Sequence, residues 1–425
     1  MKQSKRAAAI IKRDSNVISR SVTREHSFVF KRARGMHLWD VDGKRYLDFA
    51  AGVAVANVGH TNPEVIAAIK KQMNDAMHCE FSDFYAEIPV KFAETLLSLV
   101  KGKDNIFLSN SGTESIEAAY KAARWHTNRT WTIAFEKAFH GRTMGALSMT
   151  NSRPVQRERF GPFLLVVHVP YPNFYRMKMD AEECSDFCLE KMENTMISKK
   201  GDLSAVFLEP IQGEGGYVVP PTSFVKGLRK LCNQYDALLC VDEVQAGCFR
   251  TGKFLSIENF GVEPDIISMA KGLADGLPVG ATISTKKIFD WPPGAHANTF
   301  GGNLAVSAAG VATLNYMKKK KLGENARRVG SFMMKRLEEM KDRYEIIGDV
   351  RGIGLMIGIE IVKNKRSREE DGKTKDKIIQ SAAQKGLVLL GAGANVVRIC
   401  PPLIITKQQA DQGLNILEDV IRRIS

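Results

Sequence analysis

A pattern of short apolar strand, glycine-containing turn and helix repeats from Asn105 onward, and it restricts the fold more than any other feature of the chain. The strand-like runs AVFLE and ALLCVD hold consecutive apolar residues without polar alternation. Strands of this kind are buried on both faces, as in a parallel sheet between helices. The sequence therefore predicts an α/β fold with a mostly parallel central sheet covered by helices.

The segments on either side of this region predict a smaller unit. An Asp-Gly turn joins two alternating apolar stretches within residues 36–60, which predicts that the first element is a β-hairpin and not a helix. From Leu322 a long charged helix is followed by strand-like runs such as RGIGLMIGIEIV, which indicates an α+β unit. We expect an N-terminal segment (1–60) packing on a small C-terminal α+β domain (322–425), beside a large α/β domain (61–321).

Charge and cysteine usage limit the partners. The chain has 61 Lys and Arg against 47 Asp and Glu, a net charge of +14, but the basic residues form separate clusters without interleaved aromatics. Such clusters favour solvated surface or subunit contacts over nucleic acid. No window approaches the ~18 apolar residues of a membrane helix, and AAAII is too short for a signal peptide. The 7 cysteines lack metal-ligand spacing. We expect a cytoplasmic protein without a metal, nucleic-acid or membrane partner.

Asp242 and Lys271 follow two of the apolar strands, ALLCVD and DIISMAK. The carboxyl ends of parallel strands share one rim of a sheet, where ligands bind. A lysine whose charge is suppressed by burial forms imines, and a carboxylate can keep a pyridinium nitrogen protonated. On these residues alone, a structural ion pair is the alternative interpretation.

The segment NIFLSNSGTES places Ser111, Gly112 and Thr113 between a strand and a helix that begins near Glu114. Backbone amides at a helix N-terminus bind anions, although an ordinary capped helix start has the same residues. The segment lacks the GxxxxGK[ST] of a nucleoside-triphosphate loop, so a single phosphate fits it better. A phosphate cradle, a rim aspartate and a rim lysine together describe a site for pyridoxal 5'-phosphate (PLP).

With these residues in place, the chain resembles the class III (ω-amino acid) aminotransferases of PLP fold type I, from about Phe30 to the C-terminus. The matching motifs are SNSGTES, FHGRT, EPIQGEGGYVVPP, VDEVQAGCFRTGKF, MAKGLADGLPVG, NTFGGN and VRICPPLIIT. Within the family, LDFAAGVAVANVGH and EPIQGEGGYVVPP are most similar to 4-aminobutyrate aminotransferases and their archaeal relatives, some of which act on ornithine or racemise amino acids. The resemblance implies that the large domain binds PLP.

The resemblance also implies which residues surround the cofactor. Lys271 would form the Schiff base with PLP and move the substrate proton, and Asp242 would pair with the pyridinium nitrogen. The other predicted cofactor-binding residues are Gln245 at the phenolic oxygen, Val244 and Phe139 on the two ring faces, Ser111, Gly112 and Thr113 at the phosphate, His140 beside Phe139, and Thr299 from the neighbouring subunit. For His140 a structural role is the alternative, because the lysine already supplies acid–base chemistry. The role of Thr299 requires a homodimer, which can pair further into a tetramer.

Arginines are the predicted substrate ligands, because a guanidinium holds a carboxylate through two parallel hydrogen bonds. The resemblance implies that Arg142 binds the carboxylate far from the reacting amine and that Arg398 binds an α-carboxylate. Glu214 matches the family residue that pairs with this arginine and releases it when glutamate arrives. Asp83, in CEFSDFYAE, is a candidate to receive the second ammonium group of ornithine. Glu209 belongs to a motif, but no role follows for it.

The predicted activity is PLP-dependent transfer of the ω-amino group of 4-aminobutyrate, or of a similar ω-amino acid, to 2-oxoglutarate by a ping-pong mechanism. One alternative is an ornithine δ-aminotransferase. Another is a PLP-dependent amino-acid racemase on the same fold, since both reactions begin with the same deprotonation and no motif separates them. A polyanion-binding protein that merely keeps the fold is not favoured, because Lys271, Asp242 and the phosphate cradle are intact.

Overall fold

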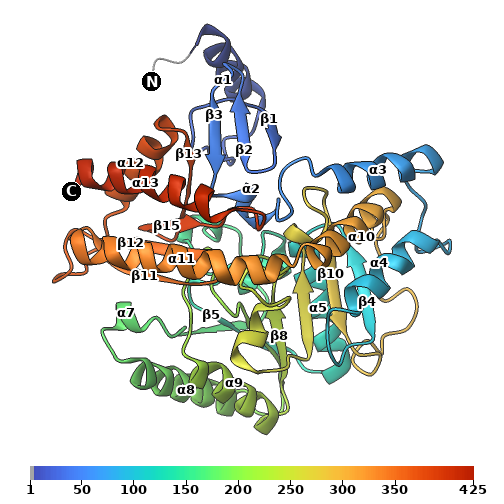
Figure 1. Cartoon of the computed structure of the whole chain (residues 1–425). Helices are drawn as coiled ribbons and strands as arrows, with labels where there is room; N and C mark the ends of the chain where they lie inside the picture. Colours follow the sequence, from blue (N-terminus) through green and yellow to red (C-terminus); the bar gives the residue numbers. More distant parts are fainter. Residues whose placement is uncertain (1–3) are drawn as a thin grey trace.

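The computed structural model describes residues 4–425, and its central feature is a seven-stranded sheet in the order β4-β10-β9-β8-β7-β5-β6 (Figure 1). Neighbouring strands from β6 to β9 pair in parallel, whereas β10 is antiparallel to both β9 and β4. The predicted α/β fold with a mostly parallel sheet is therefore confirmed. The strands are β4 (Asn105–Ser109), β5 (Trp131–Phe135), β6 (Val166–Val169), β7 (Leu203–Leu208), β8 (Leu238–Asp242), β9 (Ile266–Met269) and β10 (Gly280–Ser284).

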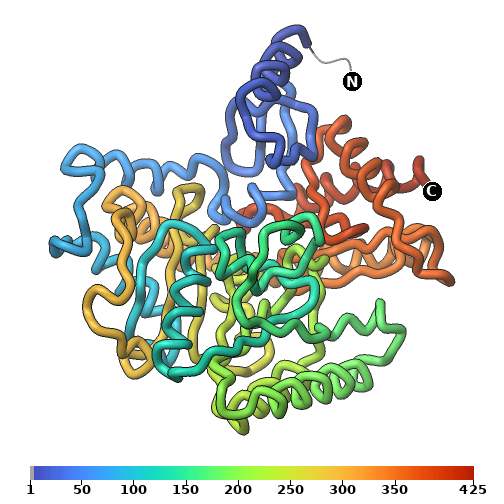
Figure 2. The backbone as a smooth tube through the Cα atoms, turned by 180° about the vertical axis from the view of Figure 1, so that it is seen from behind, coloured from blue at the N-terminus to red at the C-terminus, as the bar shows by residue number. Residues whose placement is uncertain are grey.

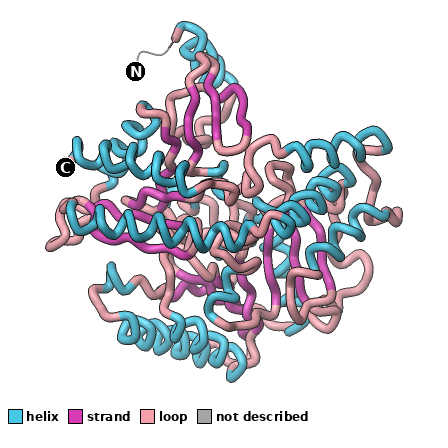
Figure 3. The backbone as a smooth tube through the Cα atoms, viewed as in Figure 1, coloured by secondary structure: helices cyan, strands magenta, loops and turns pink. Residues whose placement is uncertain are grey.

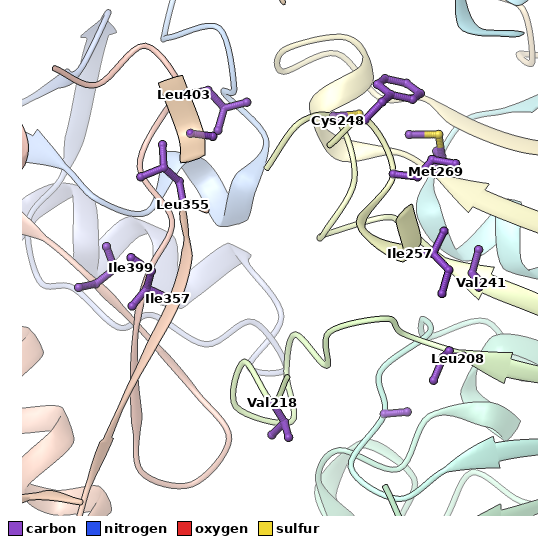
Figure 4. Packing of buried hydrophobic residues seen from close by; sticks show 14 of the residues in the cluster. Leu208, Val218, Val241, Cys248, Ile257, Met269, Leu355, Ile357, Ile399 and Leu403 are labelled. Carbon is purple, nitrogen blue, oxygen red and sulfur yellow. The ribbon is translucent and has the colours of Figure 1, made fainter. Parts of the chain in front are cut away.

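Alternate side chains of the central strands enter two different apolar clusters. In β7, Val206 and Leu208 pack in the cluster that holds the apolar residues of α8 (Ala181–Ser198) and α9 (Thr222–Gln234), while Ala205 and Phe207 pack against α5 (Gly112–Thr127) on the opposite face. Leu208, Val241 and Met269, from three adjacent strands, lie in the first cluster (Figure 4). Because helices cover both faces, the strands need no polar alternation.

The C-terminal part forms a second sheet, in the order β11-β12-β15-β14, with long helices against it (Figure 3). Its strands pair antiparallel throughout. The elements are α11 (Leu322–Arg343), β11 (Ile347–Ile353), β12 (Met356–Ile361), α12 (Gly372–Gln384), β14 (Leu390–Ala392), β15 (Val396–Ile399) and α13 (Lys407–Ile424). Ile357 of β12 and Ile399 of β15 face each other in its core (Figure 4).

The N-terminal strands form a third sheet, β1-β2-β3-β13. The predicted hairpin is present as β2 (His37–Asp40) and β3 (Arg45–Asp48), preceded by β1 (Phe30–Arg34). The prediction that this hairpin comes first was wrong, because α1 (Lys5–Val17) precedes it. The hydroxyl of Ser4 caps this helix by accepting from the amide of Ala7 at 3.1 Å, and three alanines in its first turns favour helix.

The first and last parts of the chain share this third sheet, since β3 pairs in parallel with β13 (Leu387–Val388). The two parts also lie side by side in the view from behind (Figure 2). This pairing supports our proposal that residues 1–60 pack on a small domain formed by residues 322–425, with residues 61–321 as the large domain.

Six further α-helices complete the part of the chain that the structure describes. They are α2 (Ala51–Ala54), α3 (Pro63–Asp75), α4 (Glu87–Leu97), α6 (Met144–Met149), α7 (Phe174–Met177) and α10 (Leu304–Lys319). The long helix α10 packs on α3 and α4 (Figure 1). None of the helices between residues 4 and 425 has the length and apolar character needed to cross a membrane.

Candidate cofactor and substrate site

The candidate site lies at the carboxyl-end rim of the central sheet. Asp242 is the last residue of β8, and its parallel neighbour β9 runs through Ala270 into Lys271. The backbone of Lys271 has a φ of +43°, in the left-handed region that non-glycine residues rarely adopt. Such conformations concentrate at functional positions, because the surrounding structure must hold them.

Lys271 has no hydrogen-bond partner within residues 4–425, although charged groups surround it. Burial lowers the pKa of Lys271; the positive charge of Arg398 lowers it further, while Glu214 and Asp242 act in the opposite direction. A lysine with a lowered pKa has a larger neutral fraction at neutral pH and is a better nucleophile towards a carbonyl group. The position and the electrostatics of Lys271 therefore suit imine chemistry.

Asp242 is 5% exposed and is held by two groups. Nδ1 of the buried His140 lies 2.8 Å from Oδ2, and the amide of Val244 donates to Oδ1 at 3.0 Å. Burial by itself would lower the pKa of His140, but the hydrogen bond to Asp242 and the charges of Asp242 and Glu209 outweigh it and raise the pKa. His140 therefore directly contacts the carboxylate that is predicted to face the cofactor.

The predicted phosphate cradle is the start of the helix α5. The hydroxyl of Ser111 accepts a hydrogen bond from the amide of Glu114 at 3.3 Å. Part of the hydrogen-bonding capacity of this hydroxyl is therefore used to cap the helix. Thr113 Oγ1 lies 2.7 Å from Thr143 Oγ1. A Cβ on Gly112 would lie 2.8 Å from Cγ1 of Val244, so glycine is required where this helix start approaches the residue expected on the ring face. The amides and the helix dipole make this corner a suitable anion site.

Two buried polar atoms of the site have no partner among the described residues, and both suit a polar, planar ligand. They are Nε2 of His140 and Oε1 of Gln245, whose side chain is 9% exposed. Buried polar groups are normally hydrogen-bonded. Two such atoms without a hydrogen-bond partner at the same rim therefore indicate that a polar ligand binds there. With a lysine, an anion cradle and a rim carboxylate beside them, the residues present fit PLP.

Arg142, Arg398 and Glu214, the predicted substrate ligands near the rim, lie on three segments. The guanidinium carbon of the exposed Arg142 lies 5.7 Å from the ring centroid of Phe139, a cation–π distance. Arg398, on β15, lies 2.5 Å from Oε1 of Glu214, in the loop after β7. Arg142 is thus accessible to a ligand, whereas Arg398 is already occupied by a carboxylate of the protein.

The Glu214–Arg398 pair is ionised. Burial would raise the pKa of Glu214, but the charge and hydrogen bond of Arg398 lower it, and Glu214 in turn raises the pKa of Arg398 against the effect of burial. Nε of Arg398 is buried without a partner in the described chain. The hydrogen-bonding capacity of this guanidinium is therefore not fully used by the described residues.

Sequence reasoning left Glu209 without a role and did not single out Glu117. Glu209 directly follows the end of β7, and Asp242 is the last residue of β8. Both carboxylates therefore stand at the same rim of the sheet, and this position in the sequence could have marked Glu209 as a site residue. Its carboxylate accepts from the amides of Phe139 and Gly213, each at 3.0 Å. Glu117, on α5, accepts from the hydroxyl of Thr143 and from the amide of Ala146. No local pattern marks Glu117, because its partners are distant in sequence.

Two further predicted residues lie on exposed loops that follow α3 and β10. Thr299 and Asp83 are both exposed. Their loops touch each other, since the hydroxyl of Ser82 lies 3.3 Å from the carbonyl oxygen of Asn298. The same surface exposes Phe84 and Phe300, at 65% and 58%.

Comparison with known proteins agrees with this geometry. Residues 17–421 match the family described as aminotransferase class-III. Among curated relatives, a leucine/methionine racemase of Thermococcus litoralis is 37% identical over 98% of this chain and 96% of its own. A probable 4-aminobutyrate aminotransferase of Bacillus subtilis is 35% identical (97% and 96%), and an acetylornithine aminotransferase of Methanosarcina acetivorans is 39% identical (96% and 95%).

Solved structures of transaminases share the fold over nearly the whole chain. An (S)-enantioselective ω-transaminase from Thermomicrobium roseum is 29% identical, with a TM-score of 0.92 over 98% of this chain and 99% of its own. A Bacillus anthracis aminotransferase has the same identity and TM-score over 100% of both chains. The likeness thus includes every segment that contributes to the rim.

Proposed function

Because this chain belongs to the class III aminotransferases, we propose that it transfers the ω-amino group of 4-aminobutyrate, or of a similar ω-amino acid, to 2-oxoglutarate. The cofactor is PLP, and the fold is that of fold type I. The observation that carries the ω-amine proposal is the ion pair between Glu214 and Arg398. A substrate whose reacting carbon bears no carboxylate leaves Arg398 without a partner, and Glu214 supplies one.

When bound, PLP supplies an electron sink that stabilises the charge left on the substrate carbon after its proton is removed. In our proposal Lys271 holds the cofactor covalently, Gly112 and Thr113 bind its phosphate, and Asp242 faces its ring nitrogen. His140 keeps Asp242 oriented through the 2.8 Å contact. Val244 and Phe139 enclose the ring, and Gln245 brings its unpaired oxygen and its amide to the polar edge.

The protein's own groups then perform two half-reactions. Arg142 binds the carboxylate of the ω-amino acid remote from the amine, and Lys271 accepts the proton from the carbon that bears the amine. The bound cofactor would carry the amine between the two substrates, so that the ω-amino acid would leave as an aldehyde. In the second half-reaction 2-oxoglutarate brings two carboxylates, and it leaves as glutamate after it has received the amine. Glu214 must then release Arg398 to the α-carboxylate, while Arg142 holds the other.

A homodimer completes this proposed site, with Thr299 reaching the phosphate of the neighbouring subunit. The exposed aromatic residues Phe84 and Phe300 on the same surface support the proposal, because large apolar patches mark interfaces. Light scattering should give a dimer or tetramer, and Phe300→Asp should reduce both the dimer fraction and cofactor retention. A monomer that keeps full activity would contradict the shared site.

The first experiment combines purified holoenzyme with nitrogen-labelled 4-aminobutyrate and 2-oxoglutarate and measures labelled glutamate by mass spectrometry. Rapid label transfer supports the proposal. Parallel reactions use ornithine and N-acetylornithine, since a relative named as an acetylornithine aminotransferase is 39% identical. If ornithine is preferred, Asp83→Ala should weaken ornithine much more than 4-aminobutyrate; an equal loss for both excludes Asp83 from substrate recognition.

An amino-acid racemase is a second candidate, because relatives named as racemases are 37% identical over 98% of this chain. Racemisation returns the proton to the opposite face of the same carbon without an amino acceptor. Incubation of L-leucine or L-alanine with holoenzyme in deuterated water, followed by chiral chromatography, tests it. D-enantiomer carrying deuterium, formed without 2-oxoglutarate, would favour the racemase over the aminotransferase.

A further inference from the structure

The carboxylate of Glu209 is shared between two segments that are far apart in the sequence. Oε2 accepts from the amide of Phe139 and Oε1 accepts from the amide of Gly213, each at 3.0 Å. The side chain is almost fully inaccessible, with the residue 6% exposed. Each of its oxygens therefore replaces the solvent that would otherwise satisfy one buried amide.

These two segments carry residues of both the cofactor part and the substrate part of the proposed site. The first includes Phe139, His140 and Arg142, and the second includes Glu214, which holds Arg398. Glu209 is thus placed to determine how two segments lie relative to each other. One is the 139–142 segment, which carries the predicted ring-face residue Phe139, and the other is the 213–214 loop.

Further contacts hold Glu209 and the two segments in register. The hydroxyl of Tyr171, which is also buried, donates to the carbonyl oxygen of Glu209 at 3.1 Å. Nε2 of Gln212 donates to the carbonyl oxygen of Glu136 at 2.8 Å and ties the same two segments together a second time. The backbone of Glu209 is therefore fixed independently of its carboxylate.

The geometry requires two acceptor atoms at this position. A carboxylate offers an acceptor on each oxygen, whereas an amide offers one oxygen and one NH₂ group. Glutamine would keep the shape of Glu209 but would point N–H at N–H in one of the two contacts. The substitution Glu209→Gln is therefore a near-isosteric removal of one link.

We infer that Glu209 is a positioning residue, whose carboxylate holds the 139–142 segment and the 213–214 loop together so that the ring-face aromatic and the Glu214–Arg398 switch meet the same cofactor. This inference rests on the proposed function only because it treats the Glu214–Arg398 ion pair as a switch. The link between the two segments is a property of the chain itself and is testable without a substrate.

The chain offers a matched control in Glu243. This residue directly follows Asp242 at the end of the neighbouring strand, is 1% exposed, and also divides its oxygens between two amides, those of Ser256 and Ile257, each at 2.8 Å. Burial raises the pKa of both Glu209 and Glu243 to about 7. The partners of Glu243 contain none of the predicted site residues, so Glu243→Gln removes an equivalent link elsewhere.

Hydrogen exchange of the full chain, with and without PLP, is the direct test. Glu209→Gln should raise exchange at least tenfold in peptides covering 136–142 and 210–216, and Glu243→Gln should do so in 254–260. Unchanged exchange at both site segments in Glu209→Gln, or an equal rise in all three regions, overturns the inference. If Glu209→Gln does not fold, Glu209→Asp, which withdraws both acceptor oxygens from the two amides by one CH₂ group, should raise exchange in 136–142 and 210–216, and no rise there is equally contradictory.

The functional readouts are the pH midpoint of the cofactor absorbance and the ratio of kcat/KM for glutamate to that for the ω-amine donor. Glu209→Gln should shift the midpoint and change the ratio at least tenfold, whereas Glu243→Gln should lower thermal stability and leave both unchanged. Identical midpoints and ratios in the two variants would reduce Glu209 to a structural residue. If wild type transfers no ω-amine, the proposed function fails, while exchange and the absorbance midpoint still decide this inference.

Discussion

Oε1 of Glu214 lies 2.5 Å from a guanidinium nitrogen of Arg398, and this ion pair joins the loop after β7 to strand β15. Both residues are largely buried, so each charge depends on the other for compensation. The amide of Gly393 also donates to the carbonyl oxygen of Glu214 at 2.8 Å. The pair is thus held by backbone as well as by charge, and an incoming carboxylate must compete with it.

Glu214→Gln should separate the two half-reactions. The amide leaves Arg398 without an anion when an ω-amine is bound, so we expect kcat/KM for 4-aminobutyrate to fall about tenfold or more, equivalent to about 1.4 kcal/mol. Glutamate brings its own α-carboxylate and should lose much less. Single-turnover absorbance changes with each substrate measure the two values, and an equal loss for both would contradict the switch.

Lys271→Ala should abolish covalent attachment of the cofactor and lower amine transfer by at least about 10³-fold, since both the nucleophile and the general base are lost. Borohydride reduction followed by peptide mass spectrometry should locate the cofactor on Lys271 in wild type. Label on another lysine would reassign the site. Lys253→Ala, at a residue exposed on the same domain, controls for the loss of one positive charge.

Gly112→Ala should weaken cofactor binding by about tenfold or more. The new methyl group would lie 2.8 Å from Cγ1 of Val244 and 3.5 Å from Cβ of Ala270, and overpacking of this kind costs about 1–3 kcal/mol. Equilibrium dialysis against PLP measures the change in Kd. Adding Val244→Ala removes the overlapping carbons, so the double variant should regain part of the affinity; no recovery would place the defect elsewhere.

Asp275 should make folding stability fall as the pH rises. Burial raises the pKa of Asp275 to about 8, against the hydrogen bond from the amide of Val58 at 3.0 Å. Because this pKa lies above the unfolded value, the folded state binds more protons between about pH 4 and pH 8. The stability that Asp275 contributes is present below that window and is lost through it, by up to about 1.4 kcal/mol per pH unit.

Asp275→Asn keeps an acceptor for Val58 and removes the titration. Its unfolding free energy relative to wild type should therefore rise from pH 5 to pH 8, as measured by urea unfolding at several pH values. A constant difference across this range would contradict the assignment. Asp342→Asn, at an exposed position on α11, controls for the loss of a negative charge.

Local patterns were sufficient for the elements and for the rim. Consecutive apolar residues in β7 and β8 follow from burial on both faces, and Asp242 and Lys271 could be placed at one rim because parallel strands end on the same side. The exception is α1, a helix that precedes the predicted hairpin. Its signals are the N-cap residue Ser4 and the helix propensity of the alanines in its first turns. The Asp-Gly turn within residues 36–60 predicts a hairpin there, but it carries no information about the residues that precede it.

Local sequence patterns were enough for the α/β class, for the alternation of strands and helices after Asn105, and for the residue types at the ends of β8 and β9, because burial and turn chemistry act over a few neighbouring residues. Three pairings emerged only in the folded chain: His140 with Asp242, Glu209 with the amides of Phe139 and Gly213, and β3 with β13. These contacts join residues far apart in the chain, and their energy depends on the folded positions and on the low polarity around them. No spacing in a single sequence records either quantity.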